Sequence, residues 1–517
     1  MKIRNEIIQK IKTTNEYDVV VIGGGATGLG TALDSTLRGY KTLLLEAYDF
    51  AKGTSSRSTK LAHGGVRYLK QGDVSMVKEA LRERGLMKEN APHLVHDQKF
   101  IVPVYDWWDA PVYTTGLKVY DVMAGKLGLG PSEMISKEET LKMIPNLNEE
   151  GLIGGVRYYD GQFDDARLAI TLMQTIIDFE GDVINYAKVT GLLKEENILK
   201  GVEVEDQETG ELIQVNAKNV INATGVFVDS ILKMDNEDAL PSVSPSQGVH
   251  IILDKEFLKG SSSIMVPRTD DGRVLFAVPW YDKIVVGTTD TPMEEVSIEP
   301  VALEEEIEFI LKTAKKYLHK EPKREDVKAV FAGLRPLMKS TDEDTKKISR
   351  SHKIVKSQSG LITVVGGKWT TYRQMSEDVI NFMERKNEDI GVKCITKDVL
   401  LHGYKKDVDR LDVRSVYGND LPKIELLIKN DPSLNKYIHP DLPYRWAEVK
   451  WGVENELART VDDILSRRTR SLLFDAKASL EASSKVAEFM ADLLGKDEAW
   501  IENQITSFKK LVDNYTC

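Results

Sequence analysis

Cysteine is scarce in this sequence. Only two cysteines occur among 517 residues, Cys394 and the C-terminal Cys517. This count excludes a disulfide framework, and it also excludes a zinc site built from Cys-x-x-Cys pairs. Such low usage is typical of a reducing compartment. We therefore expect a protein without a disulfide framework and without a metal site.

Long hydrophobic runs are missing as well. No stretch reaches the roughly 18 consecutive apolar residues that a membrane-spanning helix requires. The N-terminal sequence MKIRNEIIQKIKTTNEYD also lacks the continuous apolar segment of a signal peptide. We therefore expect a cytoplasmic protein, either free in the cytosol or lying peripherally on the inner face of the cytoplasmic membrane.

The chain has no excess of positive charge. Its formal net charge is −11 at pH 7, whereas proteins that bind nucleic acids carry a basic excess to match the phosphate backbone. We therefore expect no nucleic-acid partner, although a local basic pocket for a small anion is compatible with this charge. A length of 517 residues exceeds one ordinary hydrophobic core, so two or three domains are expected.

The strongest motif lies near the N-terminus, where the pattern is strand, glycine turn, helix and strand. The apolar run YDVVVIG begins at Tyr17, and the glycine sequence GGGATG follows from Gly23 to Gly28. In such a turn the glycines permit a tight bend, a close backbone approach to a pyrophosphate and close helix–strand packing. The start of the helix offers unpaired N–H groups to the phosphates. Glu46 ends the next strand, where its carboxylate can accept hydrogen bonds from ribose hydroxyls.

A second glycine element favours FAD over NAD as the dinucleotide. In ITVVGGKWTTYRQM, a strand leads into Gly366-Gly367, and a helix is predicted from about Thr370. A helix N-terminus directed at an isoalloxazine ring would stabilise the negative charge of the reduced flavin, and a plain NAD dehydrogenase does not need one. The turn Asn222-Ala223-Thr224-Gly225 follows another strand and fits a further wall of the same site.

The order of these elements predicts an α/β fold with α+β elements. Alternating segments such as GRVLFAVPW and KIVVGTTD are typical of antiparallel strands, and they lie between the nucleotide-type strands. We expect a Rossmann-like FAD-binding domain interleaved with an antiparallel-sheet substrate domain, plus a helical C-terminal domain. The expected boundaries are an N-terminal arm at 1–16, FAD-binding segments at 17–75, 150–240 and 350–390, substrate-binding segments at 76–149 and 241–349, and the helical domain at 395–517.

Three local features have structural interpretations. The isoleucines from Ile3 to Ile11 recur at helical spacing, and packing against the body of the protein is favoured over membrane contact. Trp107-Trp108 is expected in the core of the substrate domain, with an exposed interaction patch as the alternative. The cluster from Arg467 to Arg470 is expected on a solvated face or at a helix C-terminus, with contact to anionic lipid as the minor alternative.

Five further segments are more specific together than any one of them alone. They are TSSRSTKLAHGGVRYL (54–69), GTTDTP (287–292), AGLRPL (332–337), ISR (348–350) and GGKWTTYR (366–373). They resemble the signature segments of the FAD-dependent glycerol-3-phosphate dehydrogenases, aerobic and quinone-linked type. The resemblance implies oxidation of sn-glycerol 3-phosphate to dihydroxyacetone phosphate, with hydride transfer to FAD and electrons passed to a membrane quinone. The oligomeric state stays open, with a homodimer among the options.

The resemblance and the two glycine elements together give a set of expected site residues. On the cofactor side these are Gly23, Gly25, Ala26, Thr27, Gly28, Glu46, Ser55, Ser56, Thr59, Lys60, Leu61, His63, Gly64, Gly65, Ala223, Thr224, Gly225, Gly366, Gly367 and Lys368. On the substrate side they are Arg67, Tyr68, His250, Arg335, Arg350, Lys368 and Thr370. The segment GVHIILD, which carries His250, matches the family only loosely.

The chemistry of this substrate assigns roles within the set. A phosphate needs cations, and arginine suits it by bidentate binding, so Arg335 and Arg350 are the favoured phosphate ligands, with ordinary ion pairs as the alternative. The C2 hydrogen must leave as hydride while the hydroxyl loses a proton. His250 is the expected base, although a hydrogen-bonded core histidine fits its apolar neighbours too, and Lys368 is the rival base.

Three other functions fit parts of the pattern. A glycerol-3-phosphate oxidase would use the same site and pass electrons to oxygen. An amine or 2-hydroxy-acid oxidase would need a clamp for carboxylate instead of phosphate. A flavin-binding module without turnover would lack the cations opposite the flavin. The expected cations argue against the last two functions. The oxidase branch tends to carry an extra insertion for which this chain is too short, so the dehydrogenase is favoured.

Overall fold

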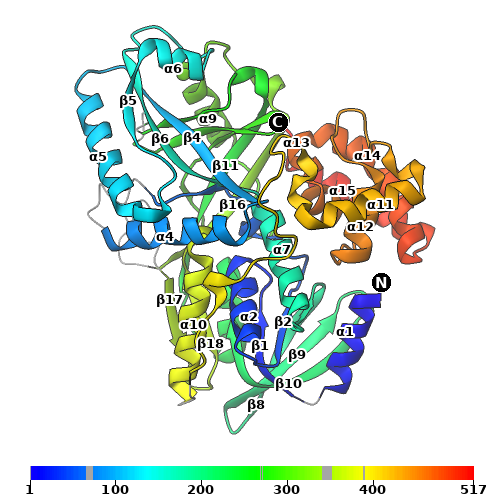
Figure 1. The fold of residues 1–517 in the computed structure, drawn as a ribbon. Coiled ribbons are helices and arrows are strands. Elements are labelled where there is room, and N and C mark those ends of the chain that lie inside the picture. Colours follow the sequence, from blue (N-terminus) through cyan, green and yellow to red (C-terminus); the bar gives the residue numbers. More distant parts are fainter. Residues whose placement is uncertain are drawn as a thin grey trace.

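The computed structural model describes residues 2–14, 16–65, 74–267, 269, 272–339, 352–387 and 391–517. Three lobes are visible, one built on each of two β-sheets and a third formed by C-terminal helices at one side (Figure 1). The longer helices are α1 (Lys2–Thr13), α2 (Ala26–Leu37), α4 (Val74–Asn90), α5 (Asp109–Ala124), α6 (Lys137–Met143), α7 (Asp165–Asp178), α8 (Val228–Asp235), α9 (Glu304–Tyr317), α10 (Tyr372–Asn387), α11 (Leu421–Asn430), α12 (Trp446–Asn455), α14 (Ala476–Leu494) and α15 (Glu498–Asp513); α13 (Ser471–Phe474) is short.

The first sheet has a parallel centre. Its strand order is β17-β18-β10-β1-β2-β7, and β8 and β9 extend it by antiparallel pairing from β10. The strands are β1 (Tyr17–Ile22), β2 (Thr42–Leu45), β7 (Asp182–Ile184), β8 (Ala187–Glu195), β9 (Ile198–Asp206), β10 (Glu211–Asn222), β17 (His352–Lys356) and β18 (Ile362–Gly366). The carboxyl ends of β1, β10 and β18 therefore meet at one edge, because all three run parallel. This confirms the strands predicted before the three glycine turns.

The second sheet has mostly antiparallel neighbours. Its order is β15-β11-β14-β13-β12-β4-β6-β3, with β16 paired to β11 and β5 to β6. The strands are β3 (Leu61–Ala62), β4 (Val95–Val104), β5 (Glu133–Ser136), β6 (Gly154–Phe163), β11 (Val243–Asp254), β12 (Ser263–Val266), β13 (Leu275–Trp280), β14 (Lys283–Gly287), β15 (Thr291–Pro292) and β16 (Ala329–Met338). The antiparallel pair predicted around 272–290 is β13–β14.

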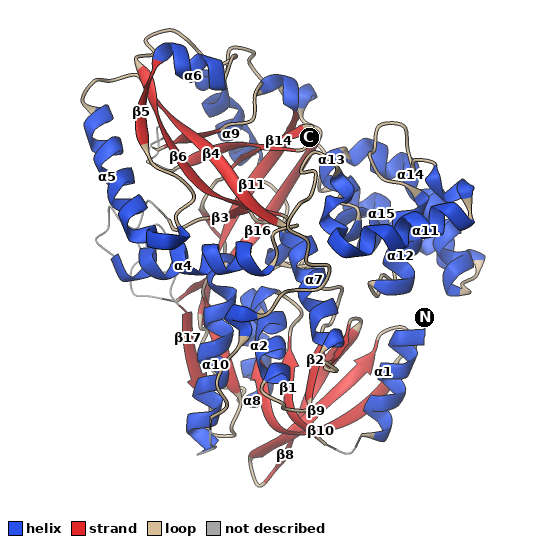
Figure 2. Ribbon diagram, viewed as in Figure 1, coloured by secondary structure: helices blue, strands red, loops and turns tan. Residues whose placement is uncertain are grey.

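One segment lies across the expected domain boundary at residue 150. Strand β6 was expected with the FAD-binding segments, but it pairs along its whole length with β4 of the second sheet. The two strands have matching buried runs, and this long antiparallel register joins them into one core. The chain returns to the first sheet only after β6, through α7, which lies between the lobes (Figure 2).

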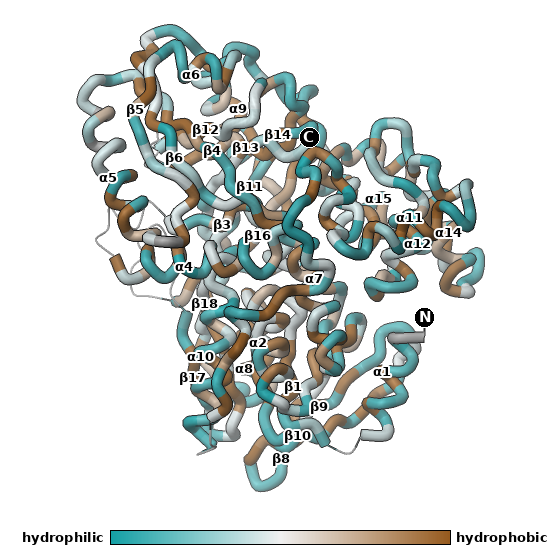
Figure 3. The backbone as a smooth tube through the Cα atoms, viewed as in Figure 1, coloured by the Kyte–Doolittle hydropathy of each residue, from teal (hydrophilic) through white to brown (hydrophobic). Residues whose placement is uncertain are grey.

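The N-terminal helix packs as expected. Ile7, Ile8 and Ile11 of α1 are buried in one core with the outer face of the first sheet. Figure 3 shows the same alternation, with hydrophilic and hydrophobic stretches along α1. Within the described ranges, no helix combines the length and the apolar character that a bilayer-crossing segment needs.

The C-terminal helical region, residues 413–513, contains α11 to α15. The stretch SSKVAEFMADLLG (483–495), whose apolar residues recur at helical spacing, lies in α14 up to Leu494. The stretch VENELARTVDDILSRRTRSLLF (453–474) also has helical spacing, but it does not form one helix. Helix α12 ends at Asn455, and a π-helix follows at Asp463–Arg468. Leu457, within the interruption, has φ +55°, and Arg467 and Arg468, within the π-helix, bind a carboxylate of the first lobe.

Two expectations about surface and core are wrong. The Arg467–Arg470 cluster does end a helix, but it is not solvated, because Arg467, Arg468 and Arg470 are each about 2% exposed or less. Arg467 and Arg468 both bind the buried Asp49 at 2.5 Å, so acids from the first lobe neutralise them. Trp107 and Trp108, expected in a core, are 72% and 85% exposed beside the start of α5.

Candidate functional site

The first glycine turn has the geometry that dinucleotide binding requires. Gly23 has φ +111°, and a Cβ there would lie 2.7 Å from the carbonyl oxygen of Ala223. A Cβ on Gly28 would lie 1.8 Å from the carbonyl oxygen of Gly23. The two glycines therefore let α2 start directly against β1 and β10. Helix α2 begins at Ala26, so its first N–H groups face the end of the strands.

A cavity of about 300 Å³ opens at this edge of the sheet. It brings together many of the predicted cofactor residues from four separate parts of the chain. These are Gly23, Gly25, Ala26, Thr27, Glu46, Ser55, Ala223, Thr224, Gly225, Gly366, Gly367 and Lys368. The two glycines of the second element have φ +82° and +90°, which side chains with a Cβ rarely adopt, so this turn too depends on glycine.

Glu46 lies at the wall of the cavity with a restrained carboxylate. Its Oε2 accepts a hydrogen bond from the N–H of Gly24 at 2.6 Å, and its Oε1 accepts one from Tyr48 at 2.8 Å. Burial raises the pKa of Glu46, and these two N–H donors act against that rise. The arrangement fixes an acceptor group beside the helix start, where a ribose would lie.

Ser55 connects the two glycine elements. Its hydroxyl accepts a hydrogen bond from the N–H of Ala26 at 2.9 Å. Its carbonyl oxygen accepts one from the indole N–H of Trp369 at 2.8 Å. One loop residue thereby joins the start of α2 to the turn before α10, and both helix starts are held at the same cavity.

The other predicted residues of the 54–65 segment do not line this cavity. Ser56 and Lys60 are buried, and the Lys60 amine binds Asp165 at 2.8 Å. Leu61 pairs with β6 as part of β3. The N–H of Gly64 donates to the Tyr120 hydroxyl at 2.7 Å. His63 is half-buried, and Gly65 adopts φ +74°.

His250 and Arg335 lie on adjacent strands of the second sheet, β11 and β16. The ring of His250 stacks on Phe331 with centroids 4.8 Å apart, and its Nε2 lies 2.8 Å from the hydroxyl of Thr59. Burial and the nearby charges of Arg335 and Lys60 lower the pKa of His250 to about 3. The imidazole is therefore neutral near pH 7, so it can accept a proton only weakly.

Arg335 is a half-buried cation with several acceptors. Its Nη1 lies 3.2 Å from Asp290, and its Nη2 donates to the Thr288 hydroxyl at 3.1 Å and to the Thr289 carbonyl at 3.0 Å. The Asp290 ion pair offsets part of its charge. The side chain is 19% exposed, so it lies at a surface that a ligand can reach.

The remaining predicted substrate residues fall into two groups. Lys368 lines the cavity at the second glycine turn, and Thr370 is buried one turn before α10. Arg67, Tyr68 and Arg350 lie outside the described residues.

Comparison with known proteins now identifies the family. Residues 18–373 match the model "FAD dependent oxidoreductase", and residues 361–501 match the "C-terminal domain of alpha-glycerophosphate oxidase". The mitochondrial glycerol-3-phosphate dehydrogenase of Bos taurus is 40% identical over 98% of this chain and 75% of its own length. That of Schizosaccharomyces pombe is 38% identical over 96% of this chain and 87% of its own.

The chain belongs to the glycerol-3-phosphate dehydrogenase family of FAD-dependent oxidoreductases. A solved glycerol-3-phosphate dehydrogenase from Bacillus halodurans, in complex with FAD, matches with a TM-score of 0.80 and 27% identity. The match covers 99% of this chain and 97% of that one. The three-lobed fold is thus that of the family along its whole length.

The residues of this family member fit FAD. The cradle at Gly23 and Gly25 has no side chains, which leaves room for a pyrophosphate against the helix start, and Glu46 supplies an acceptor for ribose hydroxyls. The Gly366-Gly367 turn leads into a second helix start on the same cavity. These residues would hold the dinucleotide, with the second turn toward its ring.

The structure adds cavity residues that sequence motifs missed. They are contributed by β8, α8, β16 and one loop, and include Ala187, Lys188, Val189, Met234, Ile298 and Pro336. Strand β8 reaches the site because the N–H of Ala187 donates to the carbonyl of Glu46 at 2.8 Å. Pro336 lies within the quoted segment AGLRPL, whereas no motif in strand β8 pointed to the site.

Proposed function

We propose that the protein oxidises sn-glycerol 3-phosphate to dihydroxyacetone phosphate. The support is the family membership together with a dinucleotide cavity that has Lys368 on its wall. FAD, when bound, supplies the acceptor for the hydride that leaves C2 of the substrate. The chain's own residues bind the phosphate, orient C2 and remove the hydroxyl proton.

Arg335 and Lys368 are the described cations to which we assign substrate binding. The guanidinium of Arg335 is partly exposed, and its ion pair with Asp290 fixes the orientation of the two terminal nitrogens. Arg67, Tyr68, Arg350 and Thr370 complete the proposed set on the strength of the family motifs. A cluster of this kind suits a phosphate of charge about −2.

Proton removal is assigned to His250 or to Lys368. A buried neutral imidazole accepts a proton when the substrate hydroxyl lies close to it, but its pKa of about 3 makes it a weak base. Lys368 is the alternative because it lines the cavity itself. Comparing His250→Gln with Lys368→Met by pH–rate profile separates the two, since only loss of the base removes the acidic limb.

Anaerobic reduction tests the proposed reaction. The FAD-loaded protein is mixed without oxygen with glycerol 3-phosphate, glycerol, lactate or glycine, and the visible absorption of the oxidised flavin is followed. Bleaching by glycerol 3-phosphate alone is the expected result. Bleaching by lactate or glycine instead, or by none of the four, would contradict the proposal.

Electron transfer to a membrane quinone is the finer part of the proposal. The alternative is an oxidase that passes the electrons to oxygen. The match of residues 361–501 to the C-terminal domain of alpha-glycerophosphate oxidase is compatible with this alternative. Turnover with a soluble quinone in air distinguishes them. Quinone reduction with little hydrogen peroxide is expected, whereas peroxide in equal amount to the product would identify the oxidase.

A further inference from the structure

A chain of buried contacts begins in the C-terminal helical region at Arg470. This residue follows the π-helix and is 2% exposed. Its Nη2 donates to Asp165 Oδ1 at 2.8 Å, and its Nη1 lies 3.4 Å from Asp164. Asp164 and Asp165 lie at the start of α7, between the two sheets. Arg470 therefore reaches from the third lobe to the junction of the other two.

Asp165 holds a loop of the second sheet on its other side. Its Oδ2 accepts hydrogen bonds from the N–H of Ser58 at 3.0 Å and from the Ser58 hydroxyl at 2.8 Å. Its Oδ1 accepts from the Lys60 amine at 2.8 Å. Lys60 has φ +61°, a conformation that a residue with a Cβ adopts only when its surroundings impose it. The carboxylate of Asp165 thus binds both ends of the loop from Ser58 to Lys60.

The same loop contacts His250 directly through Thr59 and indirectly through Phe331. The hydroxyl of Thr59 lies 2.8 Å from His250 Nε2. The amine of Lys60 lies 5.5 Å from the ring centroid of Phe331, which stacks on His250 at 4.8 Å with an angle of 10° between the rings. A shift of this loop would therefore change both the hydrogen bond and the stacking partner of His250.

We propose that Arg470 is a positioning residue for the active site. The C-terminal helical region, through Arg470 and Asp165, fixes the loop from Ser58 to Lys60 and thereby the orientation of the His250 ring. This inference rests on the proposed function, because it takes His250 to act on the substrate. Misplacement of a reacting group by about 1 Å can lower a rate by about a hundredfold, so such a contact affects catalysis without touching the substrate.

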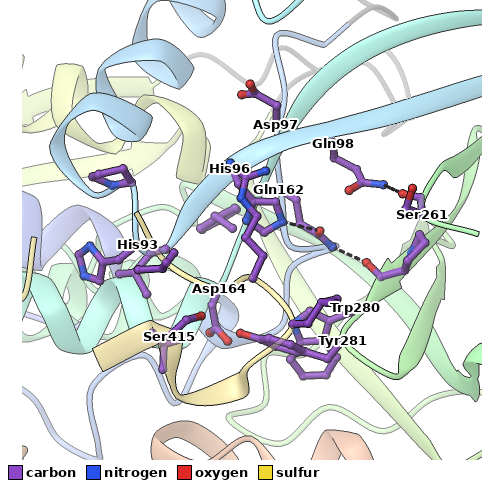
Figure 4. A pocket seen from close by; sticks show the side chains of 18 of the residues that line it. His93, His96, Asp97, Gln98, Gln162, Asp164, Ser261, Trp280, Tyr281 and Ser415 are labelled. Carbon is purple, nitrogen blue, oxygen red and sulfur yellow. Dashed lines mark hydrogen bonds between the residues drawn. The ribbon is translucent and has the colours of Figure 1, made fainter. Parts of the chain in front are cut away.

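The surroundings of Arg470 make its removal testable. Asp164 and Trp280 both contact Arg470, and together with Tyr281 they line a second cavity of about 310 Å³ (Figure 4). Asp164 borders this cavity, so solvent can compensate its carboxylate in Arg470→Ala, and Asp165 keeps its contact with the Lys60 amine at 2.8 Å. We therefore expect the variant to fold.

The chain offers a matched control in Arg459. This arginine also belongs to the C-terminal helical region, is 8% exposed, and binds Glu208 of the first lobe at 2.5 and 2.7 Å. Its partner lies in the turn between β9 and β10, away from the loop that contacts His250. Arg459→Ala therefore removes another interlobe ion pair, a less buried one in which Arg4 and Lys496 also bind Glu208, without affecting the proposed chain of contacts.

Steady-state kinetics of the FAD-loaded enzyme give the first test. Arg470→Ala should lower kcat at least about tenfold and change the KM for glycerol 3-phosphate less than about threefold, and Arg470→Lys should recover part of kcat. Arg459→Ala should lower kcat less than about twofold. Equal losses of kcat in Arg470→Ala and Arg459→Ala would overturn the proposal. Both losses would then reflect weaker attachment of the C-terminal helical region, and not a specific effect on His250.

A double-mutant cycle with Thr59→Val tests the coupling. Thr59→Val removes the hydroxyl beside His250 and keeps the size of the side chain. If Arg470 acts through this loop, the loss in kcat for the double variant should be well below the product of the two single losses. Losses that simply multiply would overturn the proposal even if each single variant is impaired.

A spectroscopic measurement separates failure of this inference from failure of the proposed function. Imidazole ¹⁵N shifts of His250 are recorded in the FAD-loaded protein, with His250→Gln used for assignment. They should change in Thr59→Val and Arg470→Ala and stay unchanged in Arg459→Ala. That pattern supports the positioning role even where glycerol 3-phosphate does not bleach the flavin, and an unchanged His250 in Arg470→Ala excludes it.

Discussion

Arg167 and Glu456 form a buried, bidentate ion pair between α7 and the C-terminal helical region. Nη1 and Nη2 of Arg167 lie 2.8 and 2.7 Å from the two carboxylate oxygens of Glu456. The side chains are 2% and 0% exposed. Burial alone would lower the pKa of Arg167, but the carboxylate of Glu456 raises it, so the guanidinium stays charged.

Removal of one partner should be costly for stability. Arg167→Leu leaves the Glu456 carboxylate buried without its main cation, so we expect the free energy of unfolding to fall by about 3–5 kcal/mol. The double variant Arg167→Leu/Glu456→Leu should recover much of this loss, because it leaves no unpaired charge. Urea unfolding followed by circular dichroism measures both. Lys323→Ala, in an exposed pair with Glu325, is the control and should change stability by less than about 0.5 kcal/mol.

His402 makes the attachment of the C-terminal region sensitive to pH. Its Nδ1 and Nε2 lie 2.6 Å from carboxylates of Asp178 and Asp420. Burial alone would lower the pKa of His402, but hydrogen bonds to both carboxylates raise it to about 9. The unfolded-state pKa is about 6.5. Because the folded-state value is the higher one, the stabilisation is fully present below about pH 6.5 and is lost as the pH rises through 9.

His402→Gln should reveal this dependence. The variant cannot carry the charge, so it should be less stable than the parent at pH 6, and the difference should shrink steadily toward pH 10. Urea unfolding of both proteins at several pH values checks this. A stability difference that is the same at every pH would show that His402 acts only as a neutral hydrogen-bonding group.

Local patterns in the sequence predicted many of the residues that line the cavity at the end of the first sheet. Three features can be recognised from a few neighbouring residues each. They are the strand before Gly23, the acidic residue Glu46 at the end of β2, and the turn at Gly366-Gly367. Their meeting at one cavity followed from the rule that parallel strands present their carboxyl ends at one edge. The fold class was predictable for the same reason.

Contacts between remote segments were not predictable in this way. Thr59 and His250 are 191 residues apart, and Arg467 and Asp49 are 418 apart. An arginine cluster read alone resembles a solvated face, because nothing nearby reveals the acids that neutralise it. Trp107 was wrongly expected in the core of the substrate domain. Its hydrophobicity favours burial, but the local sequence does not show whether another element covers it.

Gly28→Ala should abolish cofactor binding. The added methyl group would lie 1.8 Å from the Gly23 carbonyl oxygen, so α2 must move away from the strand and its N–H groups leave the pyrophosphate position. We expect the purified variant to be colourless, with FAD affinity lowered at least about a hundredfold. The ratio of flavin to protein absorption measures this. Gly116→Ala in α5, where a Cβ would meet nothing within 4 Å, is the control and should retain FAD.

Arg335→Ala should weaken substrate binding more than it affects the flavin. Loss of charge-assisted hydrogen bonds to a phosphate costs about 1.5–3 kcal/mol, which corresponds to an affinity about ten- to a hundredfold lower. Anaerobic titration of the flavin with glycerol 3-phosphate measures the Kd directly. Arg324→Ala, at an exposed pair with Glu304, should leave it unchanged.

The Arg335 experiment needs a second variant because Asp290 is only 7% exposed and loses its cation in Arg335→Ala. Arg335→Ala/Asp290→Asn removes that buried charge, so it should regain stability toward urea while keeping the weak binding of glycerol 3-phosphate. If the double variant instead regains normal affinity, the defect arose from the Asp290 carboxylate, and Arg335 is not the phosphate ligand. Weak binding in both variants assigns the phosphate to Arg335 independently of stability.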